Sequence, residues 1–359
     1  MNNLKILNAF VILALLISVF SCKKSDDDPV PEEKKKFAWA VGSVDSTGYG
    51  SILFSPDGGL TWERQGLGLN SLQGIAVNDV WPVDEETVWA VGDQNKIFKT
   101  INSGQDWTAI NPGGRPESDL KSICIHNNET IWISSSIGKI YKSDNMGTSW
   151  QIVEDDVLED KYLQGIWAYD NGVVYTVGGE KISGRDMKGF IAYSNDEGDA
   201  WDSITPANNY NQWEWIGVKS FGEKIVIYGE HAHYIASYDG GETWINDSVS
   251  NSQGMELRSD LNDLVMLDED TWWAAFDLGL IYITEDAGAT WTKQQEPSHA
   301  SGSFLVGIDY YDKDLALIVG FASFYPPVSP IIRTENGGAV WDSVYTHDVP
   351  LWKVSFVKD

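Results

Sequence analysis

One eight-residue pattern recurs seven times along this 359-residue chain. It begins with Ser or Thr, has Asp or Asn third and Gly fifth, and ends in Trp, as in "SPDGGLTW" (55–62). The final tryptophans are spaced 43 to 51 residues apart and are Trp62, Trp107, Trp150, Trp201, Trp244, Trp291 and Trp341. A near-constant period of this length indicates a repeat architecture, in which each unit buries its apolar surface against its neighbours.

Each position of this box has a physical role in a tight turn. The third residue accepts hydrogen bonds from N–H groups just ahead of it and is Asp57, Asn102, Asn145, Asp196, Asp239, Asp286 or Asn336. The fifth residue supplies a positive φ and is Gly59, Gly104, Gly147, Gly198, Gly241, Gly288 or Gly338. Because three boxes use Asn, the site needs an acceptor rather than an anion, which argues against calcium binding. The boxes are therefore predicted to be structural.

The segments between boxes predict four short strands per repeat. An apolar alternation such as "TVWAVG" (87–92) precedes each box, and another such as "LKSICIHN" (120–127) precedes most of these. We name the strands A to D in chain order, with the box between C and D. This pattern predicts an all-β, seven-bladed β-propeller. The first blade lacks strand A, and "LWKVSFVKD" (351–359) has that pattern. The C-terminal strand is expected to pair with the N-terminal blade and close the ring.

The boxes resemble the Asp-box, or bacterial neuraminidase repeat. The wider phrase around them, "VWAVG" followed by "DGGLTW"-like boxes, resembles the single seven-bladed propellers of the photosystem II assembly-factor family. That resemblance implies a protein that binds other proteins and has no known reaction. The arginine-rich patch of that family has no counterpart here, so the resemblance does not imply the same partner.

The first 36 residues differ in character from the rest. Lys5 and an apolar run over 6–20 are typical of a secretory signal, and the following Ser-Cys resembles the lipobox of bacterial lipoproteins. The boundaries expected are a signal peptide over 1–21, a lipidated Cys22 with a disordered tether over 22–36, and the propeller over 37–359. The acidic cluster after the cysteine resembles the surface-export signal of Bacteroidetes lipoproteins. This implies an outer-membrane lipoprotein exposed at the cell surface, attached only through its lipid. The alternative is an uncleaved anchor helix.

The formal net charge of −28 excludes one class of partner. An acidic surface repels nucleic-acid phosphates and anionic lipid headgroups, so no nucleic acid is expected to bind. Solubility explains the acidity, with a specific cationic partner as the alternative. Cys124 lies in an apolar alternation and is expected to be a buried small hydrophobe.

Loops between strands B and C, and between D and the next A, share one face, which we call the top face. The boxes occupy the opposite, box face. The candidate ligand-binding residues in the long top loops are Tyr210, Trp213, Phe324, Tyr325, Arg185, Glu230 and His231. The aromatic residues could form a platform for a sugar or peptide, or cap the blade ends. Asp93, Glu230 and Asp277 hold equivalent B–C positions and form either a partial acidic ring or ordinary polar turns.

A non-catalytic protein that binds a protein or glycan on its top face is the function favoured by the sequence. A sialidase-like glycoside hydrolase is the alternative, and a purely structural role is a third. Sialidases use an arginine triad, and the five arginines here are not positioned for one; Arg115, Arg185 and Arg258 lie in separate top loops. No catalytic carboxylate pair can be singled out. No cofactor or metal is expected, because His231 and His233 lack an adjacent third ligand.

Overall fold

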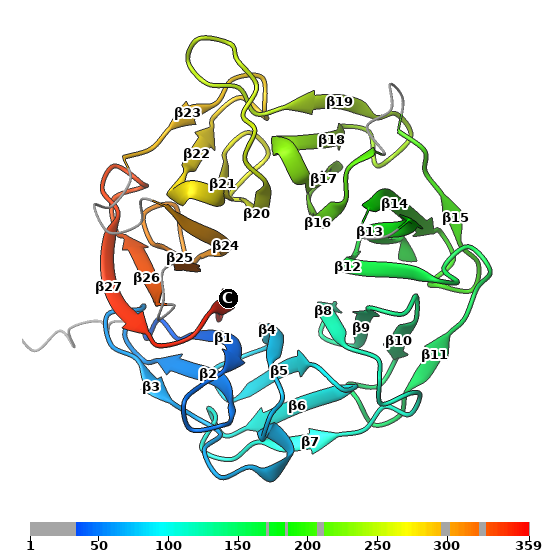
Figure 1. Cartoon of the computed structure of the whole chain (residues 1–359), viewed down its shortest axis with the longest axis vertical. Helices are drawn as coiled ribbons and strands as arrows, with labels where there is room; N and C mark the ends of the chain where they lie inside the picture. The colour runs from blue at the N-terminus through cyan, green and yellow to red at the C-terminus, as the bar shows by residue number, and fades with distance from the viewer. Residues whose placement is uncertain are drawn as a thin grey trace, which may run out of the picture. The chain divides into compact units, whose positions relative to one another are not determined.

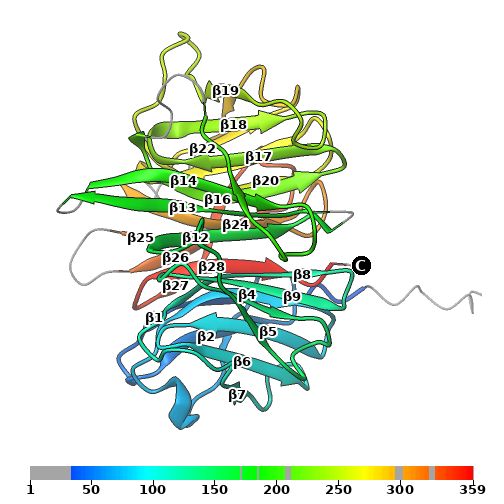
Figure 2. The ribbon, with the colours of Figure 1, turned by 90° about the vertical axis from the view of Figure 1, so that its right-hand side faces the viewer.

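The chain folds as a ring of seven antiparallel sheets around a central channel (Figures 1 and 2). The computed structural model describes residues 34–169, 172–183, 186–206, 212–295, 302–322 and 328–358. One compact unit spans Lys35–Asp359. Each sheet has four strands, as expected for a propeller blade, and the seven-bladed prediction is confirmed.

The strands are numbered in chain order and grouped by blade, with strand A innermost. Blade 1 contains β28 (Leu351–Phe356), β1 (Ala38–Val44), β2 (Gly50–Ser55) and β3 (Glu63–Arg64). Blade 2 contains β4 (Val77–Pro82), β5 (Thr87–Gly92), β6 (Lys96–Ile101) and β7 (Thr108–Ile110). Blade 3 contains β8 (Leu120–His126), β9 (Thr130–Ser135), β10 (Ile140–Ser143) and β11 (Gln151–Val153). Blade 4 contains β12 (Lys161–Ala168), β13 (Val174–Ser183), β14 (Asp186–Ser194) and β15 (Asp202–Ser203).

The last three blades follow the same order. Blade 5 contains β16 (Trp215–Phe221), β17 (Lys224–Gly229), β18 (His233–Ser237) and β19 (Ile245–Ser248). Blade 6 contains β20 (Leu261–Met266), β21 (Trp272–Phe276), β22 (Ile281–Thr284) and β23 (Thr292–Lys293). Blade 7 contains β24 (Ser303–Tyr310), β25 (Ala316–Ala322), β26 (Ser329–Thr334) and β27 (Asp342–His347). Short 3₁₀ turns are η1 (Asn70–Leu72), η4 (Glu230–Ala232) and η5 (Asp277–Gly279).

The ring closes through its two ends, as the sequence predicts. Strand β28 pairs antiparallel with β1, from Ala38 opposite Phe356 to Gly42 opposite Leu351. The C-terminal strand therefore supplies the inner strand of blade 1, and the sheet has no unpaired edge at the junction between first and last blades. The chain enters blade 1 beside its box, since Gly58 N donates to Lys36 O at 2.7 Å.

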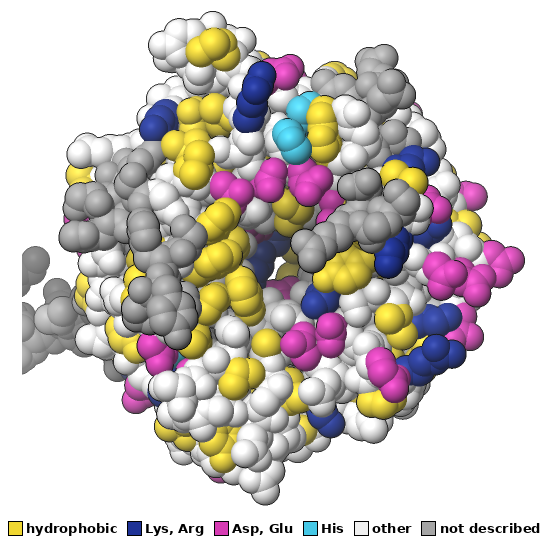
Figure 3. Space-filling view, viewed as in Figure 1, with side chains coloured by type: hydrophobic (Ala, Val, Ile, Leu, Met, Phe, Trp, Pro, Cys, Tyr) yellow, Lys and Arg dark blue, Asp and Glu magenta, His cyan; other side chains and the backbone are white. Residues whose placement is uncertain are grey.

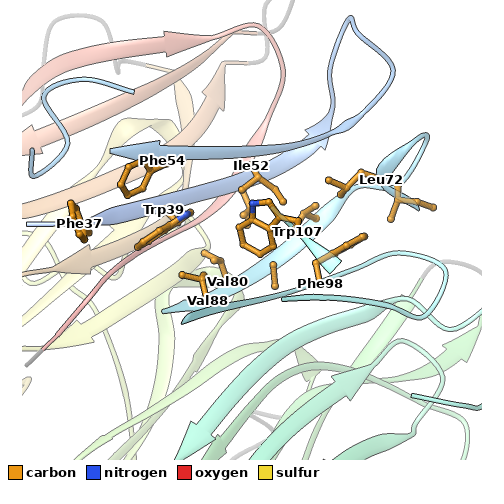
Figure 4. Close-up of a cluster of buried hydrophobic side chains, with 13 residues drawn as sticks. Phe37, Trp39, Ile52, Phe54, Leu72, Val80, Val88, Phe98 and Trp107 are labelled. Atoms are coloured by element: carbon orange, nitrogen blue, oxygen red, sulfur yellow. The ribbon is translucent and has the colours of Figure 1, made fainter. Parts of the chain in front are cut away.

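A hydrophobic cluster fills each of the seven junctions between neighbouring blades. In the junction of blades 1 and 2, Trp39, Phe54 and Phe98 pack with Trp107 (Figure 4). Every box tryptophan packs into the junction between its own blade and the preceding one. The boxes thus join blades as well as closing hairpins, and burial of seven indoles adds a large apolar area to these contacts.

The polar part of each box forms one repeated hydrogen-bond pattern. The Ser or Thr hydroxyl donates to the Asp or Asn Oδ1 and accepts from the Gly N–H, as Ser55 does with Asp57 and Gly59. That Oδ1 also accepts the N–H of the residue before Trp, at 2.8 Å in Asp57 and 2.8 Å in Asn145. Because Asn boxes make the same main-chain contacts as Asp boxes, the prediction that the position requires an acceptor is confirmed.

Cys124 is buried, as expected, and burial raises the pKa of its thiol to about 12. Within the residues that the structure describes, no helix is long and apolar enough to span a lipid bilayer. The central channel opens on the face viewed in Figure 3, which carries the B–C and D–A loops. This is the top face.

Candidate acidic and aromatic binding face

The B–C turns place three carboxylates around the channel mouth, at the equivalent positions expected from the sequence. Asn78 Nδ2 donates to Asp93 Oδ1 at 2.9 Å and to Leu120 O of the next blade at 2.8 Å. Asn262 repeats this arrangement with Asp277 (2.8 Å) and Leu305 O (2.9 Å). The third carboxylate, Glu230, instead accepts the N–H of Glu214. The inner strands therefore hold these turns in place.

Four acidic side chains gather on blades 5 and 6, and we call them the acidic arc: Glu214, Glu230, Asp260 and Asp277. All four are half-buried. Burial, opposed by a hydrogen bond from Gln164 and reinforced by the charge of Glu230, raises the pKa of Glu214 to about 7. Burial and the charge of Asp260 likewise raise the pKa of Asp277. The arc concentrates negative charge where solvent stabilises it poorly, so a cation bound there would be favoured.

Trp213 and His231 lie together beside the acidic arc. The Trp213 ring stacks on His231 at 5.1 Å between centroids and packs on His233 at 4.2 Å. His231 adopts a φ of 59° in η4, and its N–H donates to Asp260 Oδ1 at 2.9 Å. Burial lowers the pKa of His233, which favours its neutral form. The structure brings together three of the sequence candidates, Trp213, Glu230 and His231, and adds Glu214, which nothing in the sequence singled out.

Aromatic rings occupy the adjoining part of the mouth, on blades 7 and 1. Phe304 stacks on Phe321 with centroids 4.9 Å apart, and Phe321 meets Trp352 edge-on at 5.4 Å. We call these three half-buried residues the aromatic arc. Figure 3 shows acidic side chains above the opening and hydrophobic ones to its left. The sequence candidates Tyr210, Phe324, Tyr325 and Arg185 lie outside the described residues, as does Cys22.

The channel itself is a cavity of about 510 Å³ lined by all seven inner strands. Three aspartates tie adjacent inner strands together by accepting N–H groups of the next blade: Asp79 from Ile123, Asp263 from Ile308 and Asp309 from Phe356. Lys353 bonds Asp263 at 2.6 Å, and Lys358 bonds Asp309 at 2.7 Å. Two more lysines line the channel: Lys121, whose Nζ lies 3.7 Å from Asp119 Oδ2, and Lys219. The sequence analysis missed this network because its members follow no common motif.

The described arginines of the top face do not converge. Arg115 is exposed before β8 in blade 3, and Arg258 is exposed before β20 in blade 6. Among the residues that the structure describes, no group of three or more His, Cys, Asp or Glu side chains could hold a metal ion. The described top face thus offers carboxylates, aromatic rings, an exposed histidine and separate basic side chains.

Comparison with known proteins agrees with this architecture. Residues 32–186 match the family model described as photosynthesis system II assembly factor YCF48. No curated protein matches the chain in sequence. A YCF48 structure with a bound D1 peptide is 18% identical, covering 80% of this chain and 87% of that one with a TM-score of 0.60. YCF48 from Cyanidioschyzon merolae is 16% identical, covering 87% and 98%, with a TM-score of 0.58.

A glycoside hydrolase also has a similar fold. The GH74 xyloglucanase from Xanthomonas campestris is 12% identical with a TM-score of 0.55, and the match covers 85% of this chain but 58% of the enzyme. At such identity the likeness concerns the fold alone. The protein is a seven-bladed Asp-box propeller similar to the YCF48 assembly factors, in sequence over residues 32–186 and in fold over most of its length.

Proposed function

We propose that this propeller is a non-catalytic binding module that takes a protein partner on its top face. The observation that carries the proposal is that the acidic arc on blades 5 and 6 and the aromatic arc on blades 7 and 1 lie next to each other around the channel mouth. Aromatic anchors beside a charged rim are typical of protein-binding surfaces. The polar side chains of the boxes, in contrast, bond within their own turns. A YCF48 propeller binds a D1 peptide, which supports peptide binding as a use of this fold.

The chemistry of the two arcs specifies the partner further. Carboxylates with raised pKa values favour a cationic group, so the partner segment would present Lys or Arg to the acidic arc. Its apolar side chains would pack against Phe304, Phe321 and Trp352. Such a segment complements the net charge of −28 and would associate faster at low ionic strength.

Selection of a peptide-display library on the immobilised propeller tests this. Basic and apolar sequences are expected, and Glu214→Gln combined with Glu230→Gln and Asp277→Asn should weaken a selected peptide about tenfold or more. The matched control neutralises two exposed box-face glutamates, Glu242→Gln with Glu285→Gln, and should leave binding unchanged. Equal loss in both variants, or binders to a glycan array with none in the peptide library, would contradict the proposal.

We further propose that Cys22 is lipidated and that the protein is a cell-surface lipoprotein of the outer membrane. The signal-like segment before Cys22 and the charged tether after it support this. Since Lys36 joins blade 1 beside its box, a tether from Cys22 would leave the top face directed outward. Metabolic labelling with an alkyne fatty acid should mark the wild type but not Cys22→Ser. Label in both would refute lipidation, and B–C loops resistant to protease on intact cells would refute the orientation.

Glycoside hydrolysis is a second candidate, favoured by one observation. Glu214, with a pKa raised to about 7, lies beside Glu230, and a protonated carboxyl next to a carboxylate is the pair glycosidases use. A panel of fluorogenic glycosides, including a sialoside, tests it. Turnover that Glu214→Gln abolishes would establish the hydrolase and displace the non-catalytic proposal. Absence of turnover across the panel would leave peptide binding as the function of the arc.

A further inference from the structure

Lys219 on β16 is the one channel lysine without a carboxylate partner among the described residues. Lys353 and Lys358 each bond an aspartate, at 2.6 and 2.7 Å. The Lys219 ammonium instead lies 4.6 Å above the centre of the Trp167 ring on β12. It lines the 510 Å³ cavity, and Figure 3 shows basic side chains within the opening. The Lys219 ammonium thus lies on a cavity near the charges of Asp263, Asp79 and Asp309 but forms a direct ion pair with none of the described carboxylates.

The aspartates of the channel are already engaged. Asp79 accepts from Val80 N at 2.8 Å, Ile123 N at 2.9 Å and the Ser122 hydroxyl at 3.0 Å. Asp263 accepts from Tyr228 and Lys353, and Asp309 from Phe356 N and Lys358. These bonds direct the three carboxylates toward neighbouring strands. None of them forms an ion pair with Lys219.

We propose that Lys219 is the centre of a carboxylate-binding site inside the channel. A carboxylate would give Lys219 the direct charge-assisted hydrogen bond that the channel aspartates do not provide. One unpaired ammonium matches a monoanion, and the nearby Asp79 and Asp309 would repel a dianion such as phosphate. Trp81 and Trp167, with centroids 5.8 Å apart and ring planes inclined by 52°, line the same cavity and offer apolar ring surface to the body of the ligand. An aromatic or aliphatic monocarboxylate fits this combination.

The electrostatics of the channel support this assignment. Burial and the neighbouring Lys353 lower the pKa of Lys219, against the opposing effect of Asp263, Asp79 and Asp309. An anion bound to the ammonium would raise the pKa of Lys219 and so offset the effects of burial and of Lys353. The carboxylate could belong to a free small acid or to a peptide, and the site does not depend on the top-face proposal, since neither arc contributes Lys219.

Calorimetric titration of the purified protein with benzoate tests the site. We expect binding to the wild type, none of the isosteric neutral benzamide, and a loss of about tenfold or more in Lys219→Met. The matched control is Lys99→Met. Lys99 lies 4.5 Å over the Trp89 ring on an outer strand, so it makes the same ring contact away from the channel. Lys219→Arg keeps the charge and should retain binding.

Two further arms complete the test. An acetylated tripeptide ending in Phe, with a free or an amidated C-terminus, distinguishes a peptide carboxylate from a free small acid as the ligand. Binding of the free-acid peptide would show that a peptide C-terminus can enter the channel. Binding of benzoate but of neither peptide would restrict the site to small acids. Crystals soaked in 4-bromobenzoate should show bromine in the channel, whether or not Lys219→Met folds. Any of four results would overturn the proposal. These are a benzoate affinity of Lys219→Met equal to that of the wild type, a loss of affinity in Lys99→Met as large as in Lys219→Met, binding of benzamide, and no bromine in the channel.

Discussion

Lys353 donates a 2.6 Å hydrogen bond to Asp263, although the two residues belong to blades 1 and 6, which are not neighbours. The intervening blade 7 carries Gly307 at the corresponding place on its inner strand. A Cβ on Gly307 would meet Trp352 O at 2.9 Å and Lys353 Cα at 3.0 Å. The absence of a side chain there lets β24 lie close to β28, and the ion pair joins blades 6 and 1 past the inner strand of blade 7.

Removing Lys353 should therefore be costly. Burial alone would raise the pKa of Asp263, but Lys353 and Lys219 hold it below its usual value. Lys353→Met leaves a buried carboxylate unpaired and should lower the free energy of unfolding by about 3–5 kcal/mol in urea titrations. In the control Lys313→Met, which removes an exposed pair with Asp314, the change should stay within about 0.5 kcal/mol. Similar small changes in both variants would show that the pair does not stabilise the ring.

The box aspartates should tolerate Asn better than Ala. Asp57 accepts bonds from the Ser55 hydroxyl, Thr61 N and the Thr61 hydroxyl. Asp57→Asn keeps the Oδ1 contacts, as Asn102, Asn145 and Asn336 do in their boxes, and should cost under about 1 kcal/mol, whereas Asp57→Ala should cost about 2 kcal/mol. Chemical denaturation of both variants checks the difference. Equal costs would mean that the charge, not the acceptor, is required.

Acid should weaken the protein partly through these boxes. Hydrogen bonds from Thr243 and Ser237 lower the pKa of Asp239 to about 2, and hydrogen bonds from Thr290 and Thr284 lower that of Asp286. A lowered native pKa stabilises the fold above the unfolded pKa near 4, and the effect is lost as the pH falls through the native value. The melting temperature should fall between about pH 4 and 2. The melting temperature of a variant with Asn in all four Asp boxes should fall less over this range. An identical fall would show that the box aspartates do not cause the loss of stability in acid.

The box glycines should be irreplaceable for two reasons at once. Gly147 has a φ of 79°, and a Cβ there would lie 2.2 Å from the Trp89 ring of the preceding blade. Gly68 has a similar φ of 84° but nothing within 4 Å. Gly68→Ala should cost about 1–2 kcal/mol through backbone strain alone, and Gly147→Ala about 1–3 kcal/mol more through overpacking. Thermal unfolding of the two variants compares them, and equal losses would leave strain as the only cause.

Sequence reasoning recovered the architecture because the box is a local structure. Its hydrogen bonds join residues no more than four apart, so the residue types that make them recur visibly at each hairpin. Strand alternation then predicted four strands per blade, and the unpaired final alternation predicted closure by β28. The sequence predicted the positive φ of the box glycine but not its close packing against the preceding blade. That packing involves residues such as Trp89, which no box contains.

The binding face was recovered less completely for the same reason. Trp213, Glu230 and His231 could be named as candidates because they lie in top-face loops of one stretch of chain, while Glu214, the aromatic arc and Lys219 have no shared motif. Their significance comes from burial and from neighbours in other blades, brought together by the curvature of the ring. The sequence alone determined the number of blades, the turns and the closing strand, because these depend on short-range hydrogen bonds and periodic burial. Which side chains meet at the channel, and which lysine lacks a partner there, depended on long-range packing that only the tertiary structure decides.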